Sequence, residues 1–363
     1  MLRIRSAPVV VAGVFLLIGL TGWLAGLHIG LDSTVYRAGA VAVLRGEALY
    51  DQLTAIPSWS MDLPFTYPPI AAVLFTPLTL VPVQLVWALF AAASVLGVAA
   101  VLRWTSGTPL LFLLVFSLEP VWRTIGFGQI NVLLMAMVVF DLLRNDSRWS
   151  GVLIGVAAAI KLTPLIFVVH LVVTGRLREA GRALGTFLVL QLLGFLLLPG
   201  DSLRFWGSAI FTGNNATGNG YFTNQSFSGA VQRLTGGAPV LAVVLSVVCV
   251  VVAAVLARRA HLRGEHVVAM LITAGCGVLV SPISWSHHWV WVVPLVALLR
   301  SRVALVLVWV VFLGWTMFSP SGNALLDNLY VLAALVGGAV WWGRGRAGVD
   351  VRSRVGAGDG WHR

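Results

Sequence analysis

The chain has 363 residues, of which 59% are hydrophobic and 10% are charged, and its formal net charge is +11. Soluble domains carry roughly 25% charged residues, so this composition predicts an integral membrane protein with little chain left for a separate soluble domain. All but one of the 24 basic residues are arginines, and most lie in short clusters between apolar runs. Such clusters mark cytoplasmic loops, which argues against a nucleic-acid partner.

The first apolar run, residues 7–27, follows Arg3 and Arg5 and ends without the cleavage site of a signal peptide. We therefore expect a retained first span with a cytoplasmic N-terminus. A polar outer loop, residues 28–66, comes next and carries Asp32 near its start. Within this loop, residues 34–49 show helical spacing of apolar side chains, which predicts an amphipathic helix lying on the membrane surface.

The middle of the chain alternates apolar runs with short polar segments. Tyr67 precedes two prolines that suit the start of a helix, and the apolar stretches 70–80 and 83–102 follow as either two crossings or a re-entrant piece and one crossing. The polar segment 119–131 is flanked by apolar residues 109–118 and 130–143. In the run 151–175, a break at Pro164 is expected to bring Lys161 to the outer side.

A second long outer loop, residues 199–237, is rich in Gly and Asn and contains Asn224 and Gln225. Five apolar runs follow, 238–257, 266–281, 290–299, 303–318 and 328–342, with His287 and His288 before the third. About 20 apolar residues make a span, which predicts an all-α membrane protein of about ten to twelve transmembrane helices. We expect one transmembrane domain over residues 1–342 and a basic, disordered cytoplasmic tail over 343–363.

The polar side chains outside the arginine clusters map to one side of the predicted membrane: Asp32, Tyr67, Glu119, Arg123, Gln129, Asn131, Lys161, Asn224, Gln225, His287 and His288. Ionisable groups at membrane depth are costly and mark function. Residue by residue, other interpretations compete. Asp32 alone fits an interfacial charge, Lys161 a snorkelling side chain, and the histidine pair a weak metal hint. Cys249 and Cys276 fit buried structural thiols.

The sequence lacks the P-loop lysine motif and the Asp-x-Asp motif that bind nucleotides or nucleotide sugars. A transferase that uses a lipid-phosphate donor needs instead a carboxylate base, for which Asp32 is the candidate. Groups that hold the leaving phosphate are also needed, with candidates Arg37, Arg123, Lys161, His287 and His288. Candidates for gripping a sugar are the amides Gln129, Asn131, Asn224 and Gln225 and the indoles Trp285, Trp289 and Trp291, which equally fit an interfacial belt.

Six short motifs occur in a fixed order: Asp32 to Tyr36, Tyr67-Pro-Pro, Gly128-Gln-Ile-Asn131, Lys161-Leu-Thr-Pro164, Asn224-Gln-Ser226 and Ser286-His-His288. In this the chain resembles, over roughly residues 10–340, the actinobacterial polyprenyl-phosphate-mannose-dependent mannosyltransferases of glycosyltransferase family 87. The resemblance implies a GT-C fold with two long extracytoplasmic loops. It also implies an inverting transfer of mannose from β-linked polyprenyl-phosphate mannose to a cell-envelope glycolipid or lipoglycan, commonly forming an α-(1→2) linkage.

By the same resemblance, Asp32 is the general base, and the His287–His288 pair contacts the donor phosphate or the acceptor. No metal or other cofactor is expected, because basic side chains can stabilise the leaving lipid phosphate. The site is expected on the extracytoplasmic face of a bacterial plasma membrane, with both termini cytoplasmic. A transferase of arabinofuranose or glucose remains an alternative. A lipid or sugar transporter is another, although it would place ionisable groups near mid-bilayer in both halves of the chain.

Overall fold

The computed structural model describes residues 2–105, 111–144, 148–212 and 220–355. In these ranges the regular structure is helical, and the only β-type pairing is an isolated bridge between Asn224 and Trp285. The prediction of an all-α protein is confirmed.

The N-terminal half contains these helices: α1 (Leu2–Leu24), α2 (Leu31–Arg45), α3 (Pro69–Leu74), η1 (Thr76–Leu80), α4 (Val83–Thr105), α5 (Leu111–Phe116), α6 (Glu119–Phe127), α7 (Asn131–Leu143), α8 (Val152–Ile160), η2 (Thr163–Leu165) and α9 (Ile166–Val173). The C-terminal half contains α10 (Leu177–Leu197), α11 (Pro199–Arg204), η3 (Phe205–Ala209), α12 (Ile210–Thr212), α13 (Phe227–Thr235), α14 (Pro239–Leu262), α15 (His266–Val280), η4 (Ser286–His288), α16 (Val292–Leu298), α17 (Arg302–Phe312), η5 (Trp315–Met317), η6 (Leu326–Asn328) and α18 (Leu329–Val355).

Five of the described helical segments are long and apolar enough to cross a membrane: Ser6–Leu24, Val83–Thr105, Leu177–Leu197, Pro239–Leu262 and Leu326–Gly343. The pair α6 and α7 passes the same test together but is bent by 118°, and four further apolar helices are shorter. The predicted ten to twelve crossings are reached only if the bent pair and all four shorter helices are counted. The apolar stretch 70–80 is one of the short ones, since it forms α3 and η1 ahead of the single long helix α4.

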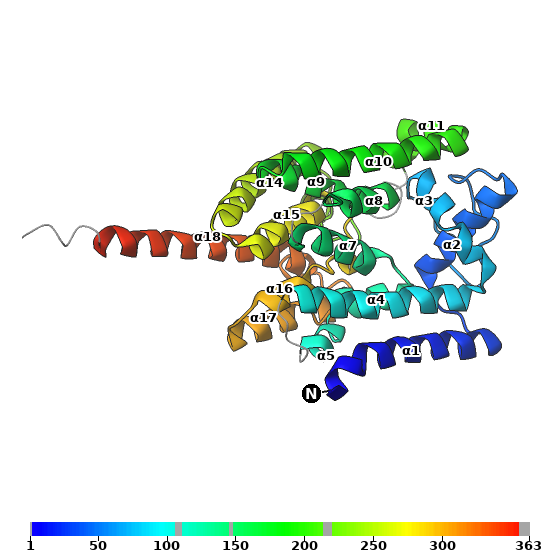
Figure 1. Ribbon diagram of the computed structural model, residues 1–363, viewed down its shortest axis with the longest axis horizontal. Helices are drawn as coiled ribbons and strands as arrows, with labels where there is room; N and C mark the ends of the chain where they lie inside the picture. The colour runs from blue at the N-terminus through cyan, green and yellow to red at the C-terminus, as the bar shows by residue number, and fades with distance from the viewer. Residues whose placement is uncertain (1, 106–110, 145–147, 213–219, 356–363) are drawn as a thin grey trace, which may run out of the picture.

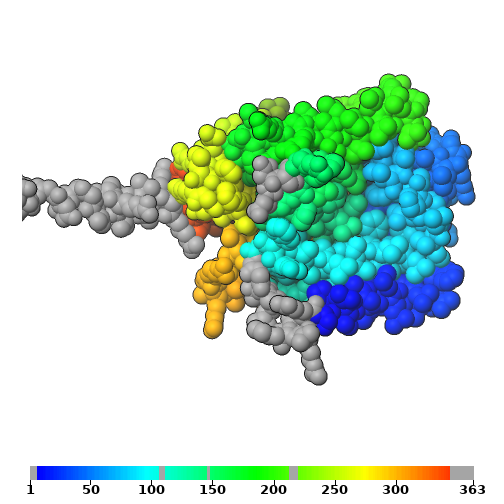
Figure 2. Space-filling model, in the orientation of Figure 1, coloured from blue at the N-terminus to red at the C-terminus, as the bar shows by residue number. Residues whose placement is uncertain are grey.

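Helices α1, α4 and α10 run along the long axis of the molecule, and α1 packs along α4 (Figure 1). In the space-filling view, α10 and α1 form opposite borders of the face shown, with α4 beside α1 (Figure 2). Burial separates the roles of the spans: 67% of the most apolar window of α4 is buried, against 6% for α14. Helix α4 therefore forms part of the core, whereas α14 presents Val and Leu side chains outward, as a lipid-facing helix does.

Helix α2 lies at the end of the body opposite to α18 (Figure 1). The sequence predicted a helix on the membrane surface here, but α2 is an internal helix that packs against α3, η1, α4 and α6. Small residues allow this close packing: a Cβ added at Gly39 would lie 2.6 Å from the Phe65 ring. The first turn of α2, which carries the half-buried Asp32, is thereby packed against the body of the protein.

The last helix extends into the C-terminal segment. Helix α18 continues to Val355, past the predicted domain boundary at residue 342, and only residues 356–363 of the tail lie outside the described part. No Pro interrupts this stretch of the sequence, so the basic segment continues the helix begun by the apolar residues before it.

Candidate active site

The bend between α6 and α7 places two amide side chains near the N-terminal end of α2. Helix α6 ends at Gly128, which has a left-handed φ of +67°. A Cβ at this position would also lie 2.7 Å from the Ser33 Oγ, so both the backbone conformation and the space require glycine. Gln129 and Asn131 follow directly, and both are buried. The turn at Gly128 therefore sets where the two amides lie relative to α2.

Asp32 occupies the first turn of α2, where the helix dipole favours a negative charge. Its Oδ2 is buried and has no hydrogen-bond partner. Burial raises the pKa of Asp32 to about 6, although a hydrogen bond from Gln129 and the charge of Lys161 both act to lower it. A carboxylate with a free oxygen and a pKa close to neutral is suited to act as a general base.

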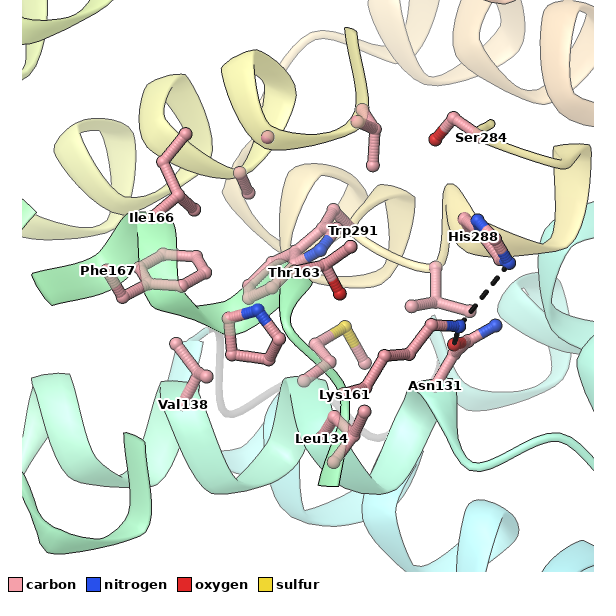
Figure 3. A pocket seen from close by; sticks show the side chains of 16 residues that line it. Asn131, Leu134, Val138, Lys161, Thr163, Ile166, Phe167, Ser284, His288 and Trp291 are labelled. Atoms are coloured by element: carbon pink, nitrogen blue, oxygen red, sulfur yellow. Dashed lines mark hydrogen bonds between the residues drawn. The ribbon is translucent and has the colours of Figure 1, made fainter. Parts of the chain in front are cut away.

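Lys161 ends α8 in an extended conformation, with φ −145° and ψ 131°. Its Nζ donates a hydrogen bond of 2.9 Å to Asn131 Oδ1 and lies 3.4 Å from His288 Nε2 (Figure 3). The same Nζ lies 5.6 Å from the centre of the Tyr67 ring. The break in the helix before Pro164 thus brings Lys161 into contact with residues of three other segments, as the sequence predicted for the break itself.

The two histidines form η4 and are held by the bend between α6 and α7. The carbonyl oxygen of His287 accepts hydrogen bonds from Thr124 Oγ1 at 2.9 Å and from Asn131 Nδ2 at 3.2 Å. His287 Nε2 is buried without a hydrogen-bond partner. Burial and the charge of Lys161 lower the pKa of both imidazoles well below the ordinary value, so both rings are neutral. A neutral ring with an unused nitrogen can still bind a substrate oxygen.

A small cavity of about 50 Å³ opens beside Lys161. Polar atoms of Asn131, Lys161 and His288 gather on one side of it, while Val138, Ile166 and Phe167 form an apolar wall (Figure 3). Ser284 also lines the cavity, and its Oγ is buried without a hydrogen-bond partner. A cationic group beside apolar walls is the combination that a lipid phosphate requires.

Arg123, one of the predicted phosphate ligands, is used in an internal network. Its guanidinium forms a 2.9 Å ion pair with Glu119 and donates a 3.0 Å hydrogen bond to Ser286 Oγ. Glu119 is fully buried and also accepts hydrogen bonds from Ser286 Oγ at 2.6 Å and from Tyr330 at 3.0 Å. This network ties η4 to α6, so Arg123 holds the segment that carries the two histidines.

Arg37 is not brought together with the other candidates. Its Nε donates a 3.0 Å hydrogen bond to the carbonyl of Val81, and its Nη2 donates one of 3.4 Å to the carbonyl of Thr79. These contacts tie α2 to the end of η1. Arg37 therefore anchors the helix that carries Asp32 and is not carried into the candidate site.

Asn224 and Gln225 likewise serve the protein itself. The Asn224 Oδ1 accepts a 2.9 Å hydrogen bond from the backbone N–H of Ser284. The Gln225 Nε2 donates to the carbonyl of Asp327 at 2.8 Å, and its Oε1 accepts from the backbone N–H of Tyr330 at 3.1 Å. Both side chains are fully buried. They fasten the loop before η4, and we do not carry them into the candidate site as sugar ligands.

The structure adds residues that the sequence did not single out as ligands. Tyr36 lies within the Asp32 motif, and Ser284 lies two residues before η4, so proximity to a motif was the only signal for either. Of the three tryptophans considered as sugar platforms, Trp291 lines the cavity. Trp285 instead pairs with Asn224 in the isolated bridge.

The sequence profile of glycosyltransferase family 87 matches residues 65–282, more than half of the chain. The chain belongs to glycosyltransferase family 87. The matched range includes Tyr67, Gln129, Asn131 and Lys161, whereas Asp32 and the two histidines lie outside it. Family 87 members are membrane enzymes of the GT-C type, in agreement with the all-helical fold and its apolar spans.

Three curated relatives show how far the likeness extends. A polyprenol-phosphate-mannose-dependent alpha-(1-2)-phosphatidylinositol pentamannoside mannosyltransferase of Mycobacterium tuberculosis is 38% identical over 73% of this chain and 65% of the relative. Two polyprenol-phosphate-mannose-dependent alpha-(1-2)-phosphatidylinositol mannoside mannosyltransferases are also similar. The one from Mycolicibacterium smegmatis is 31% identical over 93% of this chain and 88% of the relative. The one from Mycobacterium tuberculosis is 34% identical over 79% and 76%.

The chain thus spans just under two thirds of the length of the first relative and most of the length of the second. No solved structure matches the chain.

Proposed function

We propose that this family 87 glycosyltransferase moves mannose from polyprenyl-phosphate mannose to a hydroxyl of a phosphatidylinositol mannoside or a related envelope glycolipid. The relatives bear names that state this donor, this class of acceptor and an α-(1→2) linkage. The observation that carries the proposal is the meeting of Asp32, Lys161 and the η4 histidines around Gln129 and Asn131. A base and phosphate-binding groups are the two components that transfer from a lipid phosphate needs.

In the proposed reaction, Asp32 Oδ2 accepts the proton of the acceptor hydroxyl. The hydroxyl oxygen forms a bond to the mannose C1 on the face opposite to the phosphate. The bond between C1 and the phosphate oxygen breaks, and its electron pair leaves with polyprenyl phosphate. A β-linked donor then gives an α-mannoside, because attack from the opposite face inverts the configuration at C1.

The leaving phosphate gains negative charge as the bond to C1 breaks. Lys161 is a cation at the edge of the apolar cavity, and His287 Nε2 and Ser284 Oγ are buried polar atoms without a hydrogen-bond partner. We assign Lys161 and the η4 histidines to the donor phosphate, because charge-assisted hydrogen bonds to a phosphate are the strong ones. Asn131 positions Lys161 through the 2.9 Å hydrogen bond between them.

We further propose that no metal ion takes part. In the described part of the chain, no three His, Cys, Asp or Glu side chains gather as a metal site does, and Lys161 offers a positive charge for the phosphate. Transfer by membranes washed with EDTA should therefore match that of untreated membranes. A strict requirement for an added divalent cation would contradict this part of the proposal.

The protein is a membrane protein, and we propose that it lies in a bacterial plasma membrane with both termini cytoplasmic and the Asp32 site outside. The support is the position of the arginine clusters, which flank the apolar runs on the side opposite to Asp32. A lipid-linked donor suits this face, because nucleotide sugars are cytoplasmic substrates.

The direct experiment uses membranes that contain the protein, radiolabelled polyprenyl-phosphate mannose, and a panel of phosphatidylinositol mannosides as acceptors. We expect a mannosylated glycolipid whose new residue is removed by an α-(1→2)-specific mannosidase. Transfer from polyprenyl-phosphate arabinofuranose or polyprenyl-phosphate glucose, with none from the mannosyl donor, would overturn the assignment of the sugar.

A further inference from the structure

Two buried tyrosines connect to Asp32 through Gln129. Tyr36 in α2 donates a 2.7 Å hydrogen bond from its hydroxyl to Gln129 Oε1. The Tyr36 hydroxyl also lies 3.0 Å from the Tyr67 hydroxyl. Asp32 lies one helical turn before Tyr36 on the same face of α2, and hydrogen bonding from Gln129 lowers the pKa of its carboxyl. The four side chains come from α2, the segment before α3 and the turn between α6 and α7, so the arrangement exists only in the folded protein.

The chemistry of the amide fixes the direction of these hydrogen bonds. The Gln129 Oε1 accepts the Tyr36 proton, so the Gln129 Nε2 is the atom that faces Asp32. Since the Tyr36 hydroxyl has given its only proton to Gln129, the Tyr67 hydroxyl must donate to Tyr36. Burial raises the pKa of both tyrosines, Tyr36 well above the ordinary value, so both remain protonated donors.

The Gln129 amide has two ends, and only one of them can donate to the carboxylate. The flipped amide would place its oxygen against the Asp32 carboxylate, with two acceptors facing each other and no proton between them. In the flipped form the Tyr36 hydroxyl would also have to turn its proton away from Gln129 and accept from the amide NH₂, which breaks the present arrangement of the Tyr36–Tyr67 pair. The orientation of Gln129 is therefore favoured from both sides, by the Asp32 carboxylate and by the Tyr36–Tyr67 pair.

We propose that Tyr36 and Tyr67 are positioning residues that lock Gln129 with its N–H toward Asp32, and that Gln129 thereby holds the catalytic carboxylate with Oδ2 free for the acceptor hydroxyl. This inference rests on the proposed function, in which Asp32 is the base. It reassigns Gln129 from a sugar ligand to a support of the base, and it gives the same supporting role to Tyr67 in place of contact with the substrate.

A packing role for the tyrosine rings is separable from this role of their hydroxyls. The Tyr36 ring packs against Phe75 and Phe90, with centroid distances of 5.0 and 5.3 Å. The substitution Tyr36→Phe keeps these ring contacts and removes only the hydroxyl. Tyr50 offers a matched control, because its hydroxyl also makes a 2.7 Å hydrogen bond, but to the backbone carbonyl of Tyr67.

The test measures transfer from polyprenyl-phosphate mannose as a function of pH for Gln129→Met, Tyr36→Phe, Tyr67→Phe and Tyr50→Phe. We expect the acid limb of the kcat/KM profile to move to higher pH in three of these variants. The shift should be largest in Gln129→Met, which removes the N–H donor to Asp32. It should be smaller in Tyr36→Phe and smallest in Tyr67→Phe, which only loosen that donor. Loss of one net hydrogen bond should lower kcat of Tyr36→Phe roughly three- to tenfold. Tyr50→Phe should keep the acid limb of the wild type.

Each outcome of these measurements either supports the positioning role of Gln129 or overturns it. A raised KM for Gln129→Met with an unmoved acid limb would show that Gln129 grips the sugar and would overturn the inference. An equal shift in Tyr50→Phe would reduce the effect to packing and would also overturn it. If Tyr36→Phe does not accumulate in membranes, Gln129→Met and Tyr67→Phe carry the same comparison. Asp32→Asn separates the two proposals: full activity in that variant contradicts the base itself, whereas an inactive Asp32→Asn with an unchanged Tyr36→Phe contradicts only the positioning.

Discussion

Replacing Lys161 by Met should be among the most damaging changes to transfer. The charge of this side chain acts both on the proposed base and on the proposed phosphate-binding group. Its Nζ donates to Asn131 Oδ1 at 2.9 Å, lies 3.4 Å from His288 Nε2, and its charge lowers the pKa of Asp32. Met has a similar length and flexibility but no charge and no donor. The substitution therefore removes the interactions and largely preserves the volume.

The substitution should have three effects. Losing one preorganised donor to a developing anion costs about 3–4 kcal/mol, which corresponds to a fall of about 10²–10³-fold in kcat/KM. The pKa of Asp32 also rises without the Lys161 charge, so the acid limb of the profile moves to higher pH. Asn131 Oδ1 loses its donor, at a cost in stability of about 1–3 kcal/mol.

The assay is the initial rate of mannose transfer in proteoliposomes, measured across pH for wild type, Lys161→Met and Lys161→Arg. Lys161→Arg keeps the charge and should lose less activity than Lys161→Met, although the larger guanidinium does not reproduce the ammonium geometry. A thermal unfolding measurement separates loss of fold from loss of chemistry. Activity of Lys161→Met within threefold of the wild type, with an unmoved acid limb, would refute the assignment of Lys161 to the phosphate.

Three further predictions concern other parts of the account. The wild-type kcat/KM should fall as the pH drops through about 6, because Asp32 is then protonated and cannot accept a proton; a profile that stays flat down to pH 5 would contradict a base with that pKa. Gly128→Ala should lower the unfolding temperature and abolish transfer, since the left-handed φ costs about 1–2 kcal/mol and the Cβ would meet Ser33. Gly126→Ala is the control that should retain the unfolding temperature and transfer, because Gly126 lies within α6 and a Cβ added there has no atom within 4 Å. A cysteine at Met61, which is 62% exposed in the loop after α2, should react with membrane-impermeant maleimide from the outside; labelling only after the membrane is opened would contradict the topology.

The sequence predicted the helical membrane fold, because apolar runs and arginine clusters depend only on local composition. It also predicted the helix break at Pro164, because a proline disrupts the helix in its own neighbourhood, and the structure has this break between α8 and η2. The internal position of α2 was missed. Alternating polar and apolar residues fit a membrane surface as well as a packed interior. The close contact of Gly39 with Phe65 joins residues that are distant in the sequence, so no local pattern indicates it.

In the candidate site, too, the sequence indicated the residue types but not the contacts between distant residues. Residue types alone could not separate Lys161, which meets Asn131 and His288, from Arg37, which hydrogen-bonds to backbone carbonyls of the segment around η1. Both are basic residues on the predicted outer side. Tyr36 was overlooked because a tyrosine inside an apolar helix resembles ordinary core, and only its partner Gln129, distant in sequence, gives the hydroxyl a role.

The central claim is that Asp32 is the base for transfer from a lipid-phosphate donor, and the comparison of Asp32→Asn with Asp62→Asn tests it most directly. Asp62 lies in the same segment between α1 and α3 but accepts a surface hydrogen bond from Gln52, so its substitution controls for the loss of a carboxylate from that segment. Removing a general base costs about 10²–10⁴-fold in rate. We expect both variants to accumulate in membranes, with normal transfer by Asp62→Asn and a loss of that size in Asp32→Asn. Near-normal turnover by Asp32→Asn would contradict the claim.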